Sequence, residues 1–277
     1  YKNTFIRVPP NIEKINQKLH YLKNKPQPDQ RTPEWYLFRY NLITASNAWK
    51  ILDSESAKNS IIYEKCKPHD NTKYDKVNLN SPFHWGTKFE PISVQLYEEK
   101  YNTKVDDFGC IQHDTYSFLG ASPDGIITDD TSDLYGRMLE IKNIVNREIN
   151  GIPKMEYWIQ MQLQMEVCDL NECDFLETKF LEYNDYTEFK NDGTFNKTKD
   201  DKQKGAFMLF MKEGKPHYEY PPVSLSEEDF LKWENEIMEK NIDIPWVKNV
   251  YWHLHTFSCV LVLRNKPWFK EIIGDIE

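Results

Sequence analysis

Cysteine is scarce in this chain of 277 residues, and it never occurs in a metal-binding pattern. The five cysteines are scattered, odd in number, and include no Cys-x-x-Cys pair. Disulfide frameworks and structural zinc sites both depend on more closely organised cysteines. We therefore expect reduced thiols, mostly buried, and no structural zinc.

Long hydrophobic runs are also missing. A typical apolar stretch, Cys259–Leu263, is far too short to span a bilayer. The first ten residues, Tyr1–Pro10, lack the apolar core of a signal peptide. These two absences lead us to expect a soluble, intracellular protein with no membrane partner.

The chain has no excess of positive charge. Its 44 acidic and 35 basic residues give a net charge of −9, which weighs against broad, nonspecific binding of nucleic acid. An enzyme that acts on nucleic acid would need a local groove of lysine and arginine. Carboxylates neutralised by bound cations would also account for part of the acidic excess.

The hydrophobic fraction of 39% supplies a sizeable core. No internal repeat and no Pro/Gly-rich linker divides the chain, so we expect a single domain over residues 1–277. The polar stretch Tyr183–Lys204 is typical of a mobile insertion or long loop. Apolar periodicity predicts a mixed α/β (α+β) fold, a central mixed sheet flanked by helices. Helices are expected at 11–24, after Thr32-Pro33, from Thr44 or Ser46, at 89–101, 155–167 and 226–241, and strands at 109–113, 117–121, 125–128, 137–143, 173–182, 206–212 and 250–263.

The central motif is Ser122-Pro123-Asp124-Gly125, followed by Leu139-Glu140-Ile141-Lys142. Side chains alternate between the two faces of a strand, so Glu140 and Lys142 should share one face. Leu139 and Ile141 should then anchor the strand in the core. Asp124, at the turn before its own strand, could meet Glu140 across a hairpin.

Two carboxylates that converge on one point repel each other unless a cation lies between them. Mg²⁺ takes oxygen ligands, commonly one or two carboxylates with waters and phosphates. A neighbouring lysine can stabilise charge on a phosphate. These parts suit phosphodiester hydrolysis, although in isolation Glu-x-Lys is usually a solvated ion pair and Asp-Gly usually a turn.

Five ordered motifs between Thr32 and Glu182 resemble the lambda-exonuclease family, the YqaJ-type viral recombinase nucleases of the PD-(D/E)xK superfamily. The resemblance implies a restriction-endonuclease-like core over about 32–182, with a C-terminal extension over about 183–277 packed on it. The five motifs are Arg39–Ser46, Trp85–Glu90, Ser122–Gly125, Leu139–Lys142 and Gln160–Met165.

By this resemblance, Asp124 and Glu140 bind metal, with the backbone carbonyl of Ile141 as a third ligand. One or two Mg²⁺ ions would occupy the site, and Mn²⁺ would substitute. Lys142 would be the catalytic lysine. Glu90 matches an upstream acidic residue that helps to bind metal or water; alternatively, it is a helix-dipole partner in the first turn of its helix.

Gln160 matches the family's glutamine near the active site, and Gln162 is the second choice for that role. Both could instead be surface glutamines of an amphipathic helix. Arg39 and Ser46 resemble the pair that recognises a terminal 5′-phosphate, with Thr44 beside them near a helix start. Taken alone, Ser46 would be an ordinary helix cap and Arg39 a helix-surface cation.

Other polar and aromatic residues have structural interpretations. Asp114 falls where the family often has an acidic residue, with a structural role equally open. The remaining candidates share no metal-binding spacing and are expected to build core or local structure. They are His84, His113, His253, His255, Tyr251, Trp252, Phe257, Trp268 and Phe269.

The resemblance therefore predicts a large-DNA-virus exonuclease that degrades double-stranded DNA from its ends, 5′→3′, in viral recombination, repair or replication. It would act in the host cytoplasm or viral factory, with a homo-oligomeric ring and a single-strand annealing recombinase as further partners. The alternatives are an endonuclease acting on DNA or RNA and a catalytically silent nucleic-acid-binding module. A nuclease with an iron–sulfur cluster is disfavoured because the four clustered cysteines are absent.

Overall fold

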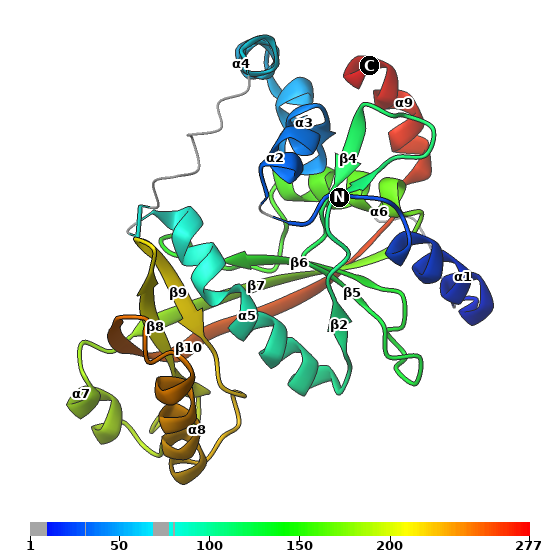
Figure 1. Cartoon of the computed structure of the whole chain (residues 1–277). Coiled ribbons are helices and arrows are strands. Elements are labelled where there is room, and N and C mark those ends of the chain that lie inside the picture. The colour runs from blue at the N-terminus through cyan, green and yellow to red at the C-terminus, as the bar shows by residue number, and fades with distance from the viewer. Residues whose placement is uncertain (1–9, 31, 69–77, 80) are drawn as a thin grey trace.

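The computed structural model describes residues 10–30, 32–68, 78–79 and 81–277. Helices cluster around one curled sheet that runs through the centre of the molecule (Figure 1). The helices are α1 (Ile12–Lys23), α2 (Pro33–Tyr40), α3 (Ala45–Asp53), α4 (Glu55–Cys66), α5 (Pro82–Tyr101), α6 (Met155–Cys168), α7 (Tyr186–Asn191), α8 (Glu227–Lys240) and α9 (Lys266–Ile276). The strands are β1 (Ile43–Thr44), β2 (Val105–Asp106), β3 (Ile111–Gln112), β4 (Leu119–Ala121), β5 (Gly125–Ile127), β6 (Met138–Asn143), β7 (Glu172–Glu182), β8 (Lys204–Lys212), β9 (Lys215–Glu219) and β10 (Trp246–Leu263).

The main sheet has the strand order β2-β5-β6-β7-β10-β8-β9. Only β6 and β7 are parallel, and α6 connects them; the other neighbouring pairs are antiparallel. A smaller sheet of order β1-β4-β3 lies beside it. The predicted mixed sheet flanked by helices is confirmed.

The two faces of β6 are covered by different helices. Met138 is buried together with Leu163 of α6, whereas the next residue, Leu139, is buried together with Tyr97 of α5. Successive side chains of a strand point to opposite faces, so α6 covers one face of the sheet and α5 the other. The helix α6 also crosses from β6 to β7, which fixes its place over the first face (Figure 1).

The C-terminal third is built into the main sheet. The long strand β10 pairs with β8 through Trp246–His253 and with β7 through Trp252–Leu263. It therefore lies between strands that precede it in the chain, in the middle of the sheet order. Among the described residues, no helix is both long enough and apolar enough to cross a membrane.

Helix α5 begins seven residues earlier than the predicted start at Phe89, because Pro82 is its first residue. The hydroxyl of Ser81 caps it by accepting a hydrogen bond from the His84 amide over 3.1 Å, and proline is favoured in a first turn. Gly86 hid this start because glycine is a poor residue inside a helix. Glu90 therefore lies well inside the helix, and its predicted place in the first turn was wrong.

The expectation of a mobile insertion or long loop at Tyr183–Lys204 was also wrong. The segment forms α7 and ends at Lys204, whose side chain is fully buried. The Lys204 ammonium donates hydrogen bonds to the carbonyls of Phe189 and Asp192, each over 2.5 Å. These bonds satisfy carbonyls at the end of α7, so one buried cation organises a segment whose composition is polar.

Candidate active site

Asp124 extends the hydrogen bonding of the sheet with its side chain. The antiparallel pairing of β5 with β6 reaches Gly125, opposite Leu139. One residue before this point, the Asp124 Oδ2 atom accepts a hydrogen bond from the backbone N–H of Ile141 over 2.6 Å. Within a strand, the N–H and C=O of one residue point to the same side. The Ile141 carbonyl therefore points toward the edge that Asp124 occupies.

Glu140 and Lys142 lie on the same face of β6, as the alternation predicted. The Glu140 side chain is fully buried and forms an ion pair with the Lys142 ammonium. The Lys142 ammonium also lies 5.1 Å from the centre of the Tyr157 ring. Leu139 and Ile141 are buried on the opposite face, which confirms that apolar neighbours anchor the polar pair.

The acidic groups interact strongly. Burial, then the Glu140 charge and then the Glu90 charge raise the pKa of Asp124 well above its usual value. Burial alone would lower the pKa of Lys142, but the Glu140 and Asp124 carboxylates outweigh it and raise that pKa. Two carboxylates, Asp124 and Glu140, thus surround a single lysine, and the Glu90 charge acts on Asp124.

Glu90 reaches these groups from α5, and a buried polar network fixes that helix against β6. The amide of Asn143, the residue after Lys142, donates to the Gly86 carbonyl over 2.9 Å. Its carbonyl oxygen accepts from the Ser93 hydroxyl over 2.7 Å. Gly86 and Ser93 flank Glu90 along the helix, so both contacts hold the segment that carries it.

A residue that the sequence did not single out completes the contacts of Glu140. Gln164 is fully buried in α6, and its amide donates to the second Glu140 oxygen over 2.6 Å. Gln160 lies one turn earlier, on the same side of α6 as Tyr157, which contacts Lys142, and Gln164. The i, i+4 spacing from Gln160 was the signal that could have identified Gln164.

Gln162 lies elsewhere. Its amide nitrogen donates to the Leu263 carbonyl over 2.9 Å, and its oxygen accepts from the Asn265 amide over 2.6 Å. Both ends of the amide therefore hold the junction between β10 and α9. The predicted substrate-binding role of Gln162 does not fit this placement.

Arg39 connects the predicted phosphate pocket to the Asp124 motif. Its guanidinium donates to the Ser122 hydroxyl over 2.6 Å and lies 4.7 Å from the centre of the Trp35 ring. Ser122 precedes Asp124 by two residues. The hydrogen bond therefore places Arg39 next to the turn that carries the first carboxylate.

Thr44 and Ser46 lie at the start of α3, as predicted. Their hydroxyl oxygens are 3.2 Å apart, and Ser46 is exposed. Thr44 is the N-cap residue, but its side chain makes no capping hydrogen bond. Strand β1 pairs Thr44 with Gly120, two residues before Ser122. The helix start and the Arg39–Ser122 contact are therefore neighbours.

Four of the residues given structural interpretations have structural contacts. His84 Nε2 lies 2.5 Å from the Tyr218 hydroxyl, and His113 Nδ1 accepts from two turn amides. Asp114 pairs with Lys25 over 2.6 Å. Trp252 is buried in the core.

A divalent cation has a chemically suitable set of donors here. Asp124, Glu140 and the Ile141 carbonyl supply the oxygen ligands that Mg²⁺ and Mn²⁺ accept. Among the described residues, no three His, Cys, Asp or Glu side chains are grouped so that they would hold a metal. An ion at this site would therefore use two carboxylates, a backbone carbonyl and non-protein oxygens, which is an ordinary ligand set for Mg²⁺.

Comparisons with known proteins place these residues in a family context. Residues 34–171 match the family model described as the YqaJ-like viral recombinase domain. An uncharacterized protein of Acanthamoeba polyphaga mimivirus is 30% identical, over 93% of this chain and 53% of that protein. The chain thus spans about half the length of the curated relative that it matches.

Two solved structures are similar in fold. An alkaline exonuclease from Laribacter hongkongensis aligns with a TM-score of 0.49 and 20% identity, over 88% of this chain and 89% of that one. A phage related exonuclease from Haemophilus somnus 129PT aligns with a TM-score of 0.46 and 13% identity, over 85% and 90% of the two chains.

Proposed function

Because this chain belongs to the YqaJ-like viral recombinase family, we propose that it is a magnesium-dependent DNA exonuclease of the PD-(D/E)xK type. It degrades double-stranded DNA from its ends, in the 5′→3′ direction, during viral recombination, repair or replication. The matched region, residues 34–171, includes Arg39, Glu90, the two carboxylates, Lys142 and Gln164.

The observation that carries the proposal is the convergence of Asp124 and Glu140 beside Lys142. Asp124 reaches the Ile141 amide, and Glu140 contacts Lys142 and Gln164. Asp124, Glu140 and the Ile141 carbonyl would hold Mg²⁺ or Mn²⁺, with Glu90 nearby. When bound, the ion supplies Lewis-acid polarisation of the scissile phosphate.

The protein's own groups have separate tasks in this proposal. Lys142 places a positive charge beside the phosphate and stabilises the negative charge that develops there. The Gln164 hydrogen bond fixes Glu140, since residues that orient a metal-binding carboxylate commonly affect activity tenfold or more. Burial of Glu140 on the α6 face keeps this pair away from bulk water.

Arg39, Thr44 and Ser46 would hold the 5′-phosphate of the DNA end. A guanidinium matches the geometry of a phosphate dianion, and hydroxyls at a helix start add donors beside backbone N–H groups. The Arg39–Ser122 hydrogen bond supports this role because it sets the distance between the gripped end and Asp124. A homo-oligomeric ring and an annealing recombinase partner rest on the family resemblance alone.

The test is digestion of three DNA substrates with Mg²⁺ or with EDTA: a linear duplex with 5′-phosphates, the same duplex with 5′-hydroxyls, and a closed circle. The wild-type chain should degrade the phosphorylated duplex fastest, from its 5′ ends, only with Mg²⁺, and leave the circle intact. Lys142→Ala should be inactive on all three. Cleavage of the circle would instead support the endonuclease alternative, and full activity of Lys142→Ala would refute the catalytic assignment.

A further inference from the structure

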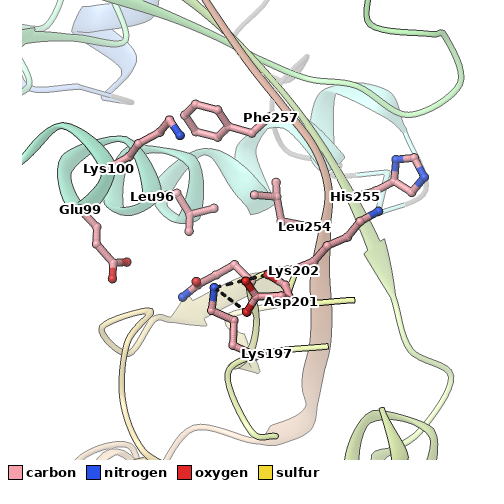
Figure 2. A pocket seen from close by; sticks show the side chains of 10 residues that line it. Leu96, Glu99, Lys100, Lys197, Asp201, Lys202, Leu254, His255 and Phe257 are labelled. Carbon is pink, nitrogen blue, oxygen red and sulfur yellow. Dashed lines mark hydrogen bonds and ion pairs between the residues drawn. The ribbon is translucent and has the colours of Figure 1, made fainter. Parts of the chain in front are cut away.

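A pocket lies away from the carboxylates, where α5, β10 and the segment 197–203 meet. Its volume is about 370 Å³, which is in the range of small-molecule sites. Figure 2 shows an apolar floor made by Leu96, Leu254 and Phe257. No part of the proposed catalytic chemistry uses these residues.

Positive charge lines the rim of this pocket, although the chain as a whole is acidic. The Lys100 ammonium lies 5.2 Å from the centre of the Phe257 ring. Lys202 extends along the opposite side toward His255 (Figure 2). Among the described residues, neither Lys100 nor Lys202 has a carboxylate within ion-pairing distance. Two cations therefore remain available for an anionic ligand.

The acidic residues of the pocket already have partners. Asp201 forms an ion pair with Lys197 over 3.5 Å, which Figure 2 shows as dashed lines. Glu99 accepts a hydrogen bond from the Ser224 hydroxyl over 2.6 Å. The pocket lining thus carries three lysines against two carboxylates, and two of the lysines have no carboxylate partner among the described residues, a balance that favours an anion.

A local irregularity of β10 shapes the same pocket. The register with β7 shifts between Leu254, opposite Phe180, and Thr256, opposite Lys179. His255 is therefore the extra residue of a β-bulge, and bulges commonly redirect a side chain. The bulge follows the last β8 partner, His253, so the redirected imidazole lies where the neighbouring strand ends and the pocket opens.

We propose that this pocket binds a nucleoside monophosphate, with the base against Phe257 and the apolar floor, the phosphate beside Lys202 and His255, and Lys100 on the opposite rim. An aromatic ring beside cations is the combination that holds one unit of a single-stranded nucleic acid without reading its sequence. The volume suits one such unit.

The bound nucleotide could be a free mononucleotide or one nucleotide of a single strand. An exonuclease generates both of these, so the source of the nucleotide rests on the proposed function, whereas the pocket itself does not. Glu90 and Leu96 are six residues apart on α5, about 9 Å along the helix axis. A nucleotide in the pocket would therefore contact the same helix that reaches the carboxylates.

The test measures binding of deoxyadenosine 5′-monophosphate to the full chain by calorimetry in EDTA, so that no turnover is needed. The double variant Lys100→Gln/Lys202→Gln should weaken binding at least tenfold, and Phe257→Leu about threefold or more. Arg39→Gln serves as the matched control, because it removes a cation from the predicted 5′-phosphate site and leaves the pocket intact. Deoxyadenosine without phosphate should bind at least tenfold more weakly than the monophosphate.

Binding that is unchanged in the double variant and in Phe257→Leu would overturn the proposal, whether or not Arg39→Gln abolishes it. A fluorescent ten-nucleotide thymidylate, measured by anisotropy, separates the two sources. If the double variant binds this strand more weakly than wild type, the pocket holds one nucleotide of a single strand. If strand binding is unchanged, the pocket holds only a free mononucleotide. Nucleotide binding without DNA cleavage would refute only the proposed exonuclease, and cleavage without nucleotide binding would refute only the pocket.

Discussion

The Arg39 guanidinium donates a hydrogen bond to the Ser122 hydroxyl over 2.6 Å, and Ser122 lies two residues before Asp124. One contact thus joins the residue predicted to hold a DNA end to the turn that carries a predicted metal ligand. Because the contact crosses from α2 to the Ser122 turn, it connects two parts of the site that are far apart in sequence. Substitutions in the two parts should therefore affect binding of the DNA end and cleavage of the bond separately.

Arg39→Gln should remove the preference for 5′-phosphorylated ends. A charge-assisted hydrogen bond contributes roughly 1.5–3 kcal/mol, so the rate on phosphorylated duplexes should fall about 10- to 100-fold. The rate on 5′-hydroxyl duplexes should change much less. Initial rates on both substrates measure this difference, and equal losses on the two would show that Arg39 acts through the fold rather than through the phosphate.

Asp124→Asn should abolish the stabilisation by Mg²⁺. At ten times its Kd, a bound ion stabilises the wild-type fold by about 1.4 kcal/mol, which corresponds to roughly 3–5 °C in Tm for a chain of this size. In EDTA the variant should melt no earlier than wild type, because it removes repulsion from Glu140 and Glu90. The exposed Asp130→Asn is the control and should keep the Mg²⁺ shift.

Gln164→Leu and Gln162→Leu should separate activity from stability. The first loses the hydrogen bond to Glu140 and should lower kcat about 10- to 100-fold. The second breaks the β10–α9 junction and should cost about 1–3 kcal/mol of unfolding free energy, with a small effect on kcat well below Tm. Urea unfolding and single-turnover rates test the pair, and a reversed pattern would exchange the roles.

His84 should make folding stability depend on pH. Burial, and then the Lys88 charge, lower the pKa of His84 in the folded chain. The unfolded chain therefore takes up a proton first as pH falls through about 6.5, and stability declines from there. The loss cannot exceed about 1.4 kcal/mol per pH unit. Urea unfolding between pH 7.5 and 5.5 should show a shallower decline in His84→Gln, and identical slopes would contradict this.

Lys204→Met should loosen α7 without inactivating the enzyme. It removes the fully buried ammonium from the carbonyls of Phe189 and Asp192. The Phe189 carbonyl keeps its hydrogen bond from the Asp192 amide, but the Asp192 carbonyl loses its lysine donor, and leaving such a carbonyl unpaired costs roughly 1–3 kcal/mol. Limited proteolysis should cut between 186 and 203 sooner than in wild type, and Lys202→Met should leave the rate of cutting unchanged.

The sequence was most informative where one local pattern had one structural solution. Alternation placed Glu140 and Lys142 on one face and Leu139 on the other, whatever the surrounding fold. It could not choose among the α6 glutamines, because a helix that is buried on nearly all sides presents Gln160, Gln162 and Gln164 to different neighbours. Only the approach of β6 and of the β10–α9 junction decides which glutamine contacts which group.

Two errors came from judging segments by composition. Gly86 made the first part of α5 look non-helical, although Ser81-Pro82 carried the capping signal. The hairpin strand β9 was missed because Lys215–Glu219 is short and polar. The structure forms it through a turn in which Glu213 and Gly214 adopt φ values of +51° and +75°.

The central place of β10 has a consequence for how the chain folds. Strand β10 must enter between β7 and β8, both of which precede it in the chain. Until then, both strands have an unpaired edge that can join another chain. Such long-range pairing slows folding and lengthens exposure to aggregation. Yield of soluble protein should therefore depend on growth temperature more than the stability of the finished fold would suggest.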